Sequence, residues 1–495
     1  MGLSPCLLGA GDVEIPLIVH DLGTASPAVL EALEMINTNR FKAAVVKLRE
    51  AQDTARDKDA QYLLGWCQYA GKGTAQSLVK AEQSFFGAAT RGQAGAQCSL
   101  GILRISTAEA GNVDRVKSGV EWLEKSAEAG VALAMRVLGD YYRSGFPPGT
   151  LEIDGQSASQ WLQKAADAGD PEALFLYAGM VEQGRGVPAE PERAWKLYEM
   201  AARRNSAPAM LRLGRRQEDG DGVPANPDNA IAWYRKAADL GSAEGYARLG
   251  TIYQKSDPDK AVENYRIAAN LGHAESQSDL GYCFEYGIGT QQSALEAVKH
   301  YTLAAEGGSP HGMFNLAACY DRGTGTSRSL ESAAHWFLSA ALLGHAPAQN
   351  EIGMRYSKGI GLQQDPVAGS LWFRLAAGQD YGPAIANLAT CYEEGNGLAA
   401  DPAKALALYI EAAGRGVSIA KYRLARMFEN GTSGKIDLEI AYLLYRESNR
   451  SGEFADGTAA AERVGRKMTA ERLRQADQFR ENWNGDVAEL LKRSR

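Results

Sequence analysis

The sequence predicts an all-α protein, an α-solenoid superhelix of about eleven helix-turn-helix repeats of 36 residues with helical caps. Three observations support this fold class. The phrase AIAWYRKAADLG at 230–241 returns as AVENYRIAANLG at 261–272 and as AVKHYTLAAEGG at 297–308. Apolar residues recur at intervals of three and four, which is the period of a helix with one buried face. The 495 residues are also too many for one compact core, which favours several domains or an elongated array.

The predicted elements follow one another in a simple order. Residues 1–26 are expected to form an extended segment, and residues 27–58 a capping pair of helices. The repeats cover 59–452, and 453–495 are expected to form C-terminal capping helices, with an independent docking helix as the alternative. The individual repeats are expected at 59–92, 93–130, 131–169, 170–205, 206–241, 242–272, 273–308, 309–344, 345–380, 381–416 and 417–452.

Each repeat is predicted to contain two helices joined by a turn. A typical first helix places Ala209, Leu213 and Gly214 on one face, with the small residue where a neighbouring helix approaches closely. The second helix ends at Gly241, a residue suited to a left-handed C-cap. The short repeat 242–272 loses residues only in the turn, as expected of a loop between packed helices. Because one hairpin cannot bury its apolar face alone, stacked copies are expected to share a continuous core.

Composition excludes several classes of function. The chain is 45% hydrophobic and 23% charged, which is typical of a folded protein. Its net charge of −7 is spread over interspersed acidic and basic residues, so neither nucleic acid nor an anionic lipid surface is an expected partner. No apolar run approaches the roughly 18 residues of a membrane span, so no transmembrane segment is expected.

No catalytic, cofactor or metal site is expected from the motifs. The G-x-G turns lack the Lys-Ser/Thr pair of a phosphate loop. The DGDG stretch at 219–222 resembles the start of a calcium loop, but Ala230 stands where the distal Glu belongs. A cryptic hydrolase remains a remote alternative. The histidines are scattered over different repeats without metal-binding spacing, at His20, His273, His300, His311, His335 and His345.

Four cysteines occupy one position of the repeat. Cys67, Cys283, Cys319 and Cys391 each lie three residues after the Leu or Ile that marks the first helix. Equivalent positions on neighbouring repeats are separated by about 9 Å, a helix-packing distance. That separation is too large for a disulfide. The cysteines are therefore expected to be small buried side chains.

The repeat pattern resembles a known family. The pattern A-x-x-x-L-G-x-x-Y-x-x-G-x-G-V, followed by D-x-x-K-A-x-x-W-Y-x-K-A-A-x-x-G, is similar to the Sel-like repeat, a branch of the tetratricopeptide-like helical repeats, over residues 59–452. Three first helices depart from the pattern, with Ala317, Ala389 and Ala425 in place of Gly. The repeat ending at Gly272 lacks G-x-G, and RESNRSG replaces the usual ending of the last repeat.

The resemblance implies a function and leaves the location open. It implies a non-enzymatic scaffold or adaptor that binds a protein or peptide segment in the concave groove, which first helices line. A cell-envelope or polysaccharide-assembly scaffold that contacts glycan or secretion-machinery subunits is the alternative. The resemblance is to proteins widespread in bacteria and favours an exported, periplasmic location, whereas Met1 as the true start would favour the cytoplasm.

Acidic residues recur near the C-terminal ends of the first helices. Acid there opposes the helix dipole and costs about 0.3 kcal/mol or more at each site, so local helix stability does not explain it. Two interpretations are open: a solvated rim, or a ladder of carboxylates that binds a cationic segment of the partner. The residues of this acidic ladder are Glu182, Glu218, Glu285, Asp321, Glu393 and Glu429.

A second position of the first helix is also expected to face the groove. It lies two residues after the marker residue and varies from repeat to repeat, as a surface that recognises one particular partner would. Packing against the next repeat is the alternative. Tyr282 and Trp66 are the strongest candidates, because aromatic side chains dominate binding hot spots. The candidates at this position are Trp66, Asp140, Arg215, Tyr282, Met354 and Arg426.

Overall fold

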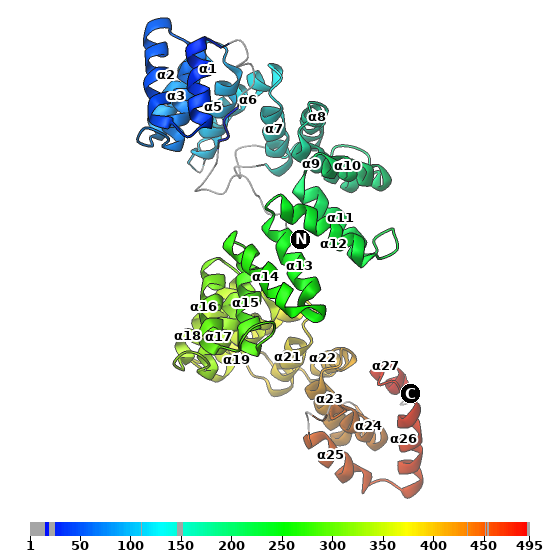
Figure 1. Cartoon of the computed structure of the whole chain (residues 1–495). Coiled ribbons are helices and arrows are strands. Elements are labelled where there is room, and N and C mark those ends of the chain that lie inside the picture. The colour runs from blue at the N-terminus through cyan, green and yellow to red at the C-terminus, as the bar shows by residue number, and fades with distance from the viewer. Residues whose placement is uncertain are drawn as a thin grey trace. The chain divides into compact units, whose positions relative to one another are not determined.

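The regular structure of the chain is entirely helical in the part that the structure describes (Figure 1). The structure is a computed structural model. Its residues 15–18, 25–109, 111–145, 152–432, 434–450, 452 and 455–492 are described here. No strand occurs in these ranges, which confirms the all-α class. The extended segment expected at 1–26 lies outside them except for 15–18 and 25–26, as does His20.

Contacts divide the chain into two compact parts, an N-terminal body (Met1–Gly245) and a C-terminal body (Tyr246–Arg495). In the N-terminal body, α1 (Pro27–Asn37) and α2 (Phe41–Ala55) precede the first repeat. The pairs that follow are α3 (Lys58–Ala70) and α4 (Leu78–Ala89), α5 (Ala94–Ser106) and α6 (Val113–Glu128), α7 (Ala132–Ser144) and α8 (Gly155–Asp167), α9 (Pro171–Gln183) and α10 (Pro191–Arg203), and α11 (Ala207–Asp219) and α12 (Pro227–Asp239).

The C-terminal body continues the same alternation, and its first helix begins just before the boundary. Its last three helices follow the final repeat. The helices are α13 (Ala243–Ser256), α14 (Pro258–Asn270), α15 (Ala274–Tyr286), α16 (Ala294–Glu306), α17 (Pro310–Arg322), α18 (Leu330–Leu342), α19 (Ala346–Lys358), α20 (Pro366–Ala377), α21 (Gly382–Glu394), α22 (Pro402–Gly414), α23 (Ser418–Asn430), α24 (Leu438–Ser448), α25 (Ala455–Gly465), α26 (Ala470–Asn482) and α27 (Val487–Lys492).

Local sequence signals explain where the helices begin and end, and α9 is typical. Asp170 is its N-cap, and the carboxylate accepts hydrogen bonds from the backbone N–H groups of Glu172 and Ala173. Pro171 follows at the first helical position, where the missing N–H costs nothing. Gly184, with φ of 68°, ends the helix in the left-handed conformation.

Within each body the helices pack in chain order (Figure 1). The first helix of a repeat packs on its second helix, which packs on the first helix of the next repeat. First helices of successive repeats also meet, as α5 with α7, α7 with α9 and α15 with α17, whereas successive second helices contact one another less. The first helices therefore line the inner face of each stack of repeats.

Small residues of the first helix let the second helix approach closely. A Cβ at Gly281 would lie 2.6 Å from the ring of Tyr301, which explains the Leu-Gly pair of the pattern. Ala317, Ala389 and Ala425, which replace this glycine, are fully buried within intact helix pairs. The departures from the pattern therefore leave the repeat packing in place.

Buried side chains account for the cysteines and for the C-terminal helices. The four cysteines of the repeat position are buried and unpaired, as predicted, and so is Cys98. Burial raises the pKa of Cys67 and Cys98 to about 12, so these thiols stay protonated and unreactive. At the other end, Val464 of α25, Trp483 just after α26 and Leu490 of α27 are buried in one cluster with residues of α22 to α24. These helices pack on the last repeat, where the sequence predicts a cap.

Candidate functional site

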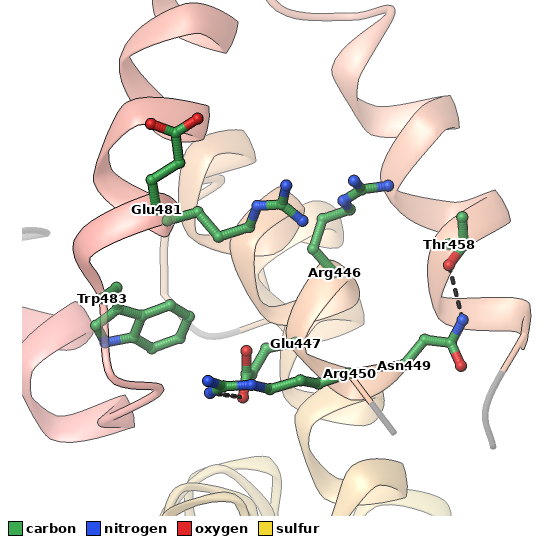
Figure 2. A pocket seen from close by; sticks show the side chains of 8 residues that line it. Arg446, Glu447, Asn449, Arg450, Thr458, Glu481 and Trp483 are labelled. Atoms are coloured by element: carbon green, nitrogen blue, oxygen red, sulfur yellow. Dashed lines mark hydrogen bonds and ion pairs between the residues drawn. The ribbon is translucent and has the colours of Figure 1, made fainter. Parts of the chain in front are cut away.

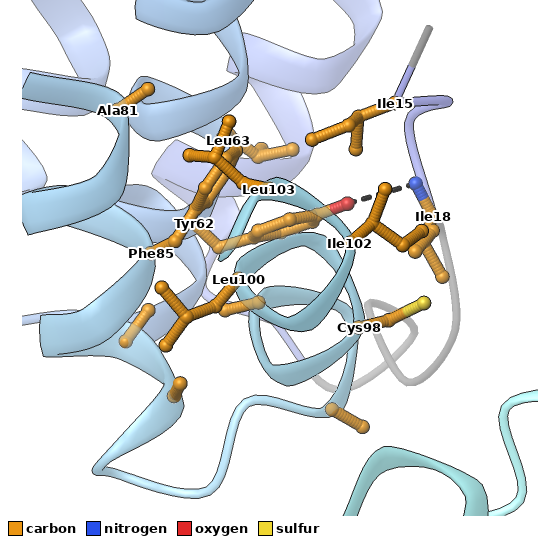
Figure 3. Packing of buried hydrophobic residues seen from close by; sticks show 14 of the residues in the cluster. Ile15, Ile18, Tyr62, Leu63, Ala81, Phe85, Cys98, Leu100, Ile102 and Leu103 are labelled. Atoms are coloured by element: carbon orange, nitrogen blue, oxygen red, sulfur yellow. Dashed lines mark hydrogen bonds between the residues drawn. The ribbon is translucent and has the colours of Figure 1, made fainter. Parts of the chain in front are cut away.

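The inner face of the N-terminal body holds a piece of the chain itself, the N-terminal segment (residues 15–18). The indole Nε1–H of Trp66 donates to the carbonyl oxygen of Ile15 at 3.2 Å. The hydroxyl of Tyr69 accepts from the backbone N–H of Ile15 at 3.3 Å, and that of Tyr62 accepts from the N–H of Ile18 at 2.9 Å (Figure 3). All three side chains bind the main chain of the segment, which has no secondary structure of its own.

The side chains of the N-terminal segment divide between core and solvent. Ile15 and Ile18 are buried in the same apolar cluster as Ile102 (Figure 3), while Pro16 is exposed. A Cβ at Gly95 would lie 3.3 Å from the carbonyl oxygen of Ile18, so the glycine lets the backbone of the segment approach α5. The face of α3 and α5 thus contacts the main chain of this segment and two of its apolar side chains, which lie three positions apart.

Trp66 is a predicted groove residue, and the structure places it in contact with this segment. Sequence reasoning missed Tyr62 and Tyr69. Their spacing of four and three residues from Trp66 puts all three aromatic side chains on one helical face, and this spacing is the signal that could have found them.

The glutamates of the acidic ladder accept hydrogen bonds from tyrosines of their own repeat. Each tyrosine lies on the second helix, 16 residues after its glutamate. The bond satisfies a buried phenol that would otherwise lack an acceptor, and it ties the first helix to the second. The five pairs are Glu182 with Tyr198 (2.9 Å), Glu218 with Tyr234 (2.6 Å), Glu285 with Tyr301 (2.8 Å), Glu393 with Tyr409 (2.7 Å) and Glu429 with Tyr445 (3.0 Å).

Cations from the following repeat or cap pair with members of the same ladder. These contacts offset the unfavourable position of an acid near a helix C-terminus, which the sequence left unexplained. Binding of a partner's cationic segment stays a prediction. The pairs are Glu182 with Arg212 (2.6 Å), Glu285 with Arg322 (2.8 Å), Asp321 with Arg355 (2.8 Å), Glu393 with Arg426 (2.6 Å), and Glu429 with Arg463 (2.7 Å) and Lys467 (2.9 Å).

Burial and hydrogen bonding shift the pKa values of these groups. Burial acts to raise the pKa of Glu429, but hydrogen bonds from Lys467, Arg463 and Tyr445 outweigh it, and the pKa lies below its usual value. Burial and the bond to Glu285 raise the pKa of Tyr301. Glu429 therefore stays charged, and Tyr301 keeps the proton that it donates.

A signal for these pairs was present in the sequence. Every ladder glutamate is followed by a tyrosine 16 residues later. Where the acid is the shorter Asp321, the later residue is Phe337, and where Ser357 replaces the acid, it is Phe373. The two positions thus vary together from repeat to repeat, which indicates contact.

The remaining predicted groove residues differ in exposure. Tyr282 is 41% exposed, and its ring centroid lies 4.6 Å from that of Tyr286. Met354 is half-buried beside a cluster formed by Phe373, Leu388 and Cys391. The charged members pair within the chain: Asp140 with Arg143 (2.5 Å), Arg215 with Glu244 (3.5 Å), and Arg426 with Glu393 as above.

Titratable groups gather on α15 and α17 and at the N-cap of α19 in the C-terminal body. His311 Nδ1 lies 3.1 Å from Glu275, and its ring contacts that of His345. Burial raises the pKa of Asp279 to about 6. Burial, and to a smaller extent the charge of His311, lower the pKa of His345 to about 4. Within the described ranges, no three His, Cys, Asp or Glu side chains are placed to hold a metal ion, and no helix is long and apolar enough to cross a membrane.

A sequence profile of the family described as Sel1 repeat matches this chain eleven times, over well more than half of its length. The eleven repeats expected from the sequence are thereby confirmed. The matches cover 58–83, 95–131, 132–170, 171–206, 207–242, 243–273, 274–309, 310–345, 346–381, 382–417 and 418–453.

Similar curated proteins come from yeasts and mouse. The chitin synthase regulator SKT5 of Saccharomyces cerevisiae is 39% identical over 83 residues, which are 17% of this chain and 12% of that protein. Chitin synthase regulatory factor 3 of Schizosaccharomyces pombe is 33% identical over 125 residues, 25% of this chain and 13% of that protein. DAP3-binding cell death enhancer 1 of Mus musculus is 30% identical over 180 residues, 36% of this chain and 34% of that protein. The chain thus matches about an eighth of the yeast proteins and a third of the mouse protein.

A similar solved structure is that of a protective antigen present in uropathogenic Escherichia coli strains, which displays an SLR fold. The two are 25% identical, and the alignment covers 91% of this chain and 96% of the antigen with a TM-score of 0.57. The likeness supports the repeat fold over nearly the whole length of both chains.

Proposed function

Because the chain belongs to the Sel1 repeat family, we propose that it is a non-enzymatic interaction scaffold that binds a protein or peptide segment along the first helices of its repeats. The observation that carries this proposal is the N-terminal segment, because it is an extended peptide already seated on the inner face of the N-terminal body. The contacts of the segment support the proposal, because a partner peptide could make the same ones.

The face of α3 and α5 recognises two features of a peptide. Trp66, Tyr62 and Tyr69 bind main-chain atoms, which every peptide offers. The apolar cluster around Ile102 takes two side chains three positions apart. A partner therefore needs an extended stretch with aliphatic residues at these two positions, and the rest of its sequence is free to vary.

The N-terminal segment competes with any such partner. A tethered peptide acts at an effective concentration on the order of millimolar. A free peptide of the same affinity for the groove has to be present above that concentration before it displaces the segment. The groove of the N-terminal body is consequently expected to bind weakly until the segment is released.

The proposal extends to the C-terminal body through Tyr282. Its exposed ring, next to Tyr286, offers an aromatic surface of the kind that anchors partners. The partner's cationic segment would meet the acidic ladder there, at Glu285 and Asp321 first, and would have to replace Arg322 and Arg355. We therefore expect Tyr282 to contribute more to binding than the ladder residues Glu218, Glu393 and Glu429.

Releasing the segment in the full-length chain tests the proposal. In the double variant Ile15→Asp, Ile18→Asp, burial of two carboxylates is too costly, so the segment should leave the groove. A labelled synthetic peptide, EIPLIV, is then expected to bind the double variant more tightly than the unaltered protein in a fluorescence anisotropy titration. Adding Trp66→Phe should weaken this binding about fivefold, because one neutral hydrogen bond of about 1 kcal/mol is lost.

A matched substitution controls for general damage. Trp233→Phe, on the second helix α12, should leave peptide binding unchanged, because Trp233 packs against a different apolar cluster. If the peptide binds neither protein, or binds both equally whether or not Trp66 is present, the inner face of the N-terminal body is not a peptide site and the proposal fails there.

A second candidate function is a scaffold for polysaccharide assembly. It is favoured by the similarity to two yeast proteins named as regulators of chitin synthase, although the match covers a small share of each. Co-sedimentation of the purified chain with insoluble chitin or peptidoglycan would test a direct glycan contact. Retention that survives high salt supports this candidate, and complete recovery in the supernatant counts against it.

A further inference from the structure

A pocket of about 450 Å³ lies between the last repeat and its cap in the C-terminal body (Figure 2). It is bounded by the end of α24, by α25, and by α26 with the residues that follow it. Its volume is in the range of sites that hold small organic molecules. The lining residues are Arg446, Glu447, Asn449, Arg450, Thr458, Arg480, Glu481 and Trp483.

The deepest charge of the pocket is already neutralised. The Glu447 side chain is 9% exposed and accepts from Lys421 Nζ and from an Arg450 guanidinium nitrogen, each at 3.3 Å. Arg450 also donates to the carbonyl oxygen of Asn484 at 3.4 Å. One carboxylate thus pairs with two cations, and neither Arg446 nor Arg480 forms an ion pair with it.

Arg446 and Arg480 are the cations without a partner. Both are half-buried, and neither side chain forms an ion pair or hydrogen bond with another of the described residues. Burial and the hydrogen bond that the Tyr442 hydroxyl donates to Asp477 at 2.7 Å raise the pKa of Tyr442, and the charges of Arg446 and Arg480 act against this rise. Figure 2 shows the carboxylate of Glu481 directed away from Arg446.

The pocket therefore carries an excess of positive charge in a chain whose net charge is −7. Two half-buried guanidinium groups that face the same space repel each other, and a bound anion would remove this cost. Each guanidinium presents a planar fork of N–H donors that fits the oxygens of a phosphate or carboxylate.

Two further residues fit an oxyanion ligand. The hydroxyl of Thr458 accepts from the side-chain amide of Asn449 at 2.9 Å, which leaves its own proton to donate into the pocket. The buried ring of Trp483 forms an apolar wall, because its Nε1–H is already bonded to the carbonyl oxygen of Asp486 at 2.9 Å. The site offers charged donors on one side and an apolar surface on the other.

We propose that this pocket binds a small organic anion through a phosphate or carboxylate group held between Arg446 and Arg480. The site lies apart from the inner face of the repeats, so it does not depend on the proposed scaffold function. An anion there would bridge α24 to α26 and fasten the cap to the last repeat.

Calorimetric titration of the full-length chain with glucose 6-phosphate and with citrate tests the proposal. Saturable binding of either anion is expected, and the tighter of the two identifies a phosphoryl or a carboxylate ligand. Arg446→Gln and Arg480→Gln should each weaken binding at least tenfold, because each removes a charged hydrogen-bond donor. Arg472→Gln, an exposed arginine on the same helix α26, should have no effect.

The thermal midpoint supplies a readout that needs no ligand. Without added anion, Arg446→Gln and Arg480→Gln should unfold at the same temperature as the unaltered chain or higher, because a repulsion is relieved. A lower midpoint would show that the two arginines stabilise the fold by other contacts and would overturn the proposal. Failure of both anions to bind, or equal loss in Arg472→Gln, would overturn it as well.

Discussion

Two successive repeats of the C-terminal body form the same kind of ion pair from the acidic ladder but bury opposite partners of that pair. Around Glu285 the carboxylate is 13% exposed, Tyr301 donates to it, and its cation Arg322 remains 52% exposed. Around Asp321 the carboxylate is 37% exposed and its cation Arg355 is 5% exposed. The ion pair of Glu285 therefore buries the acid, whereas the ion pair of Asp321 buries the base.

The burial of Arg355 is poorly satisfied. Its guanidinium carbon lies 4.7 Å from the ring centroid of Phe337, and one nitrogen pairs with Asp321. Its Nε and one terminal nitrogen are buried without an acceptor in the described part of the chain. A carboxylate can be satisfied by one phenol and one cation, whereas a guanidinium needs several acceptors. From this comparison we expect glutamate with tyrosine to stabilise a repeat more than aspartate with phenylalanine does.

The largest effect is expected from Glu429→Ala, which removes the most buried acid of the ladder. Its side chain is 8% exposed and receives Tyr445, Arg463 and Lys467. The substitution leaves a buried phenol without an acceptor and two cations without a partner, and should cost about 2 to 3 kcal/mol. Native-state hydrogen exchange of α24 amides measures this loss. Glu462→Ala, an exposed acid on α25, is the control and should change little.

Acid should reproduce part of that effect. The pKa of Glu429 is lower in the folded protein than in the unfolded chain, so the unfolded chain takes up the proton more readily. Its contribution to stability is complete above an ordinary carboxyl pKa of about 4.3 and is lost as the pH falls through the folded value. Urea midpoints measured across this range should fall less steeply for Glu429→Gln than for the unaltered chain. Equal slopes would contradict the assignment.

A smaller loss of stability is expected from Tyr301→Phe, which gives this repeat the phenylalanine that the repeat of Asp321 has at the same position. The hydroxyl that donates to Glu285 at 2.8 Å disappears while the ring still fills its place. Loss of a hydrogen bond to a charged group predicts a cost of about 1.5 kcal/mol. Tyr282→Phe removes an exposed hydroxyl and should be neutral, so a similar change in both variants would break the comparison.

The repeat fold could be predicted well from the sequence because the same local signals for helix starts, turns and close packing recur from repeat to repeat. N-caps, turn glycines and the Leu-Gly spacing recur in most of the eleven repeats, so the unclear copies did not mislead. A second role of the turn was missed: a Cβ at Gly289 would collide with the carbonyl oxygen of Pro258 in the preceding repeat. Such a contact joins residues far apart in the chain, and no local rule reports it.

The candidate site was harder to predict for the same reason. Periodicity placed Trp66 and the ladder on the first helices, but it could not show that 15–18 would occupy the groove near Trp66. Nor could it show that Tyr301 would reach Glu285, although the spacing of 16 residues repeats through the chain. Both contacts depend on how elements pack, and charge alone suggested a surface for a partner instead.

The smallest effect on stability is expected from Arg355→Met, although Arg355 is more deeply buried than Arg322. Methionine can fill the space beside Phe337 and relieves the unsatisfied nitrogens, and the Asp321 left behind has access to water. Replacing a buried ion pair with a well-packed apolar group is often neutral, so a change within about 0.5 kcal/mol is expected. Arg322→Met should cost more, about 1 kcal/mol, because the buried Glu285 loses its cation. Urea denaturation of the two variants decides between these outcomes. If Arg355→Met proves the more costly, burying the base stabilises a repeat as well as burying the acid does, and the contrast between the two repeat types fails.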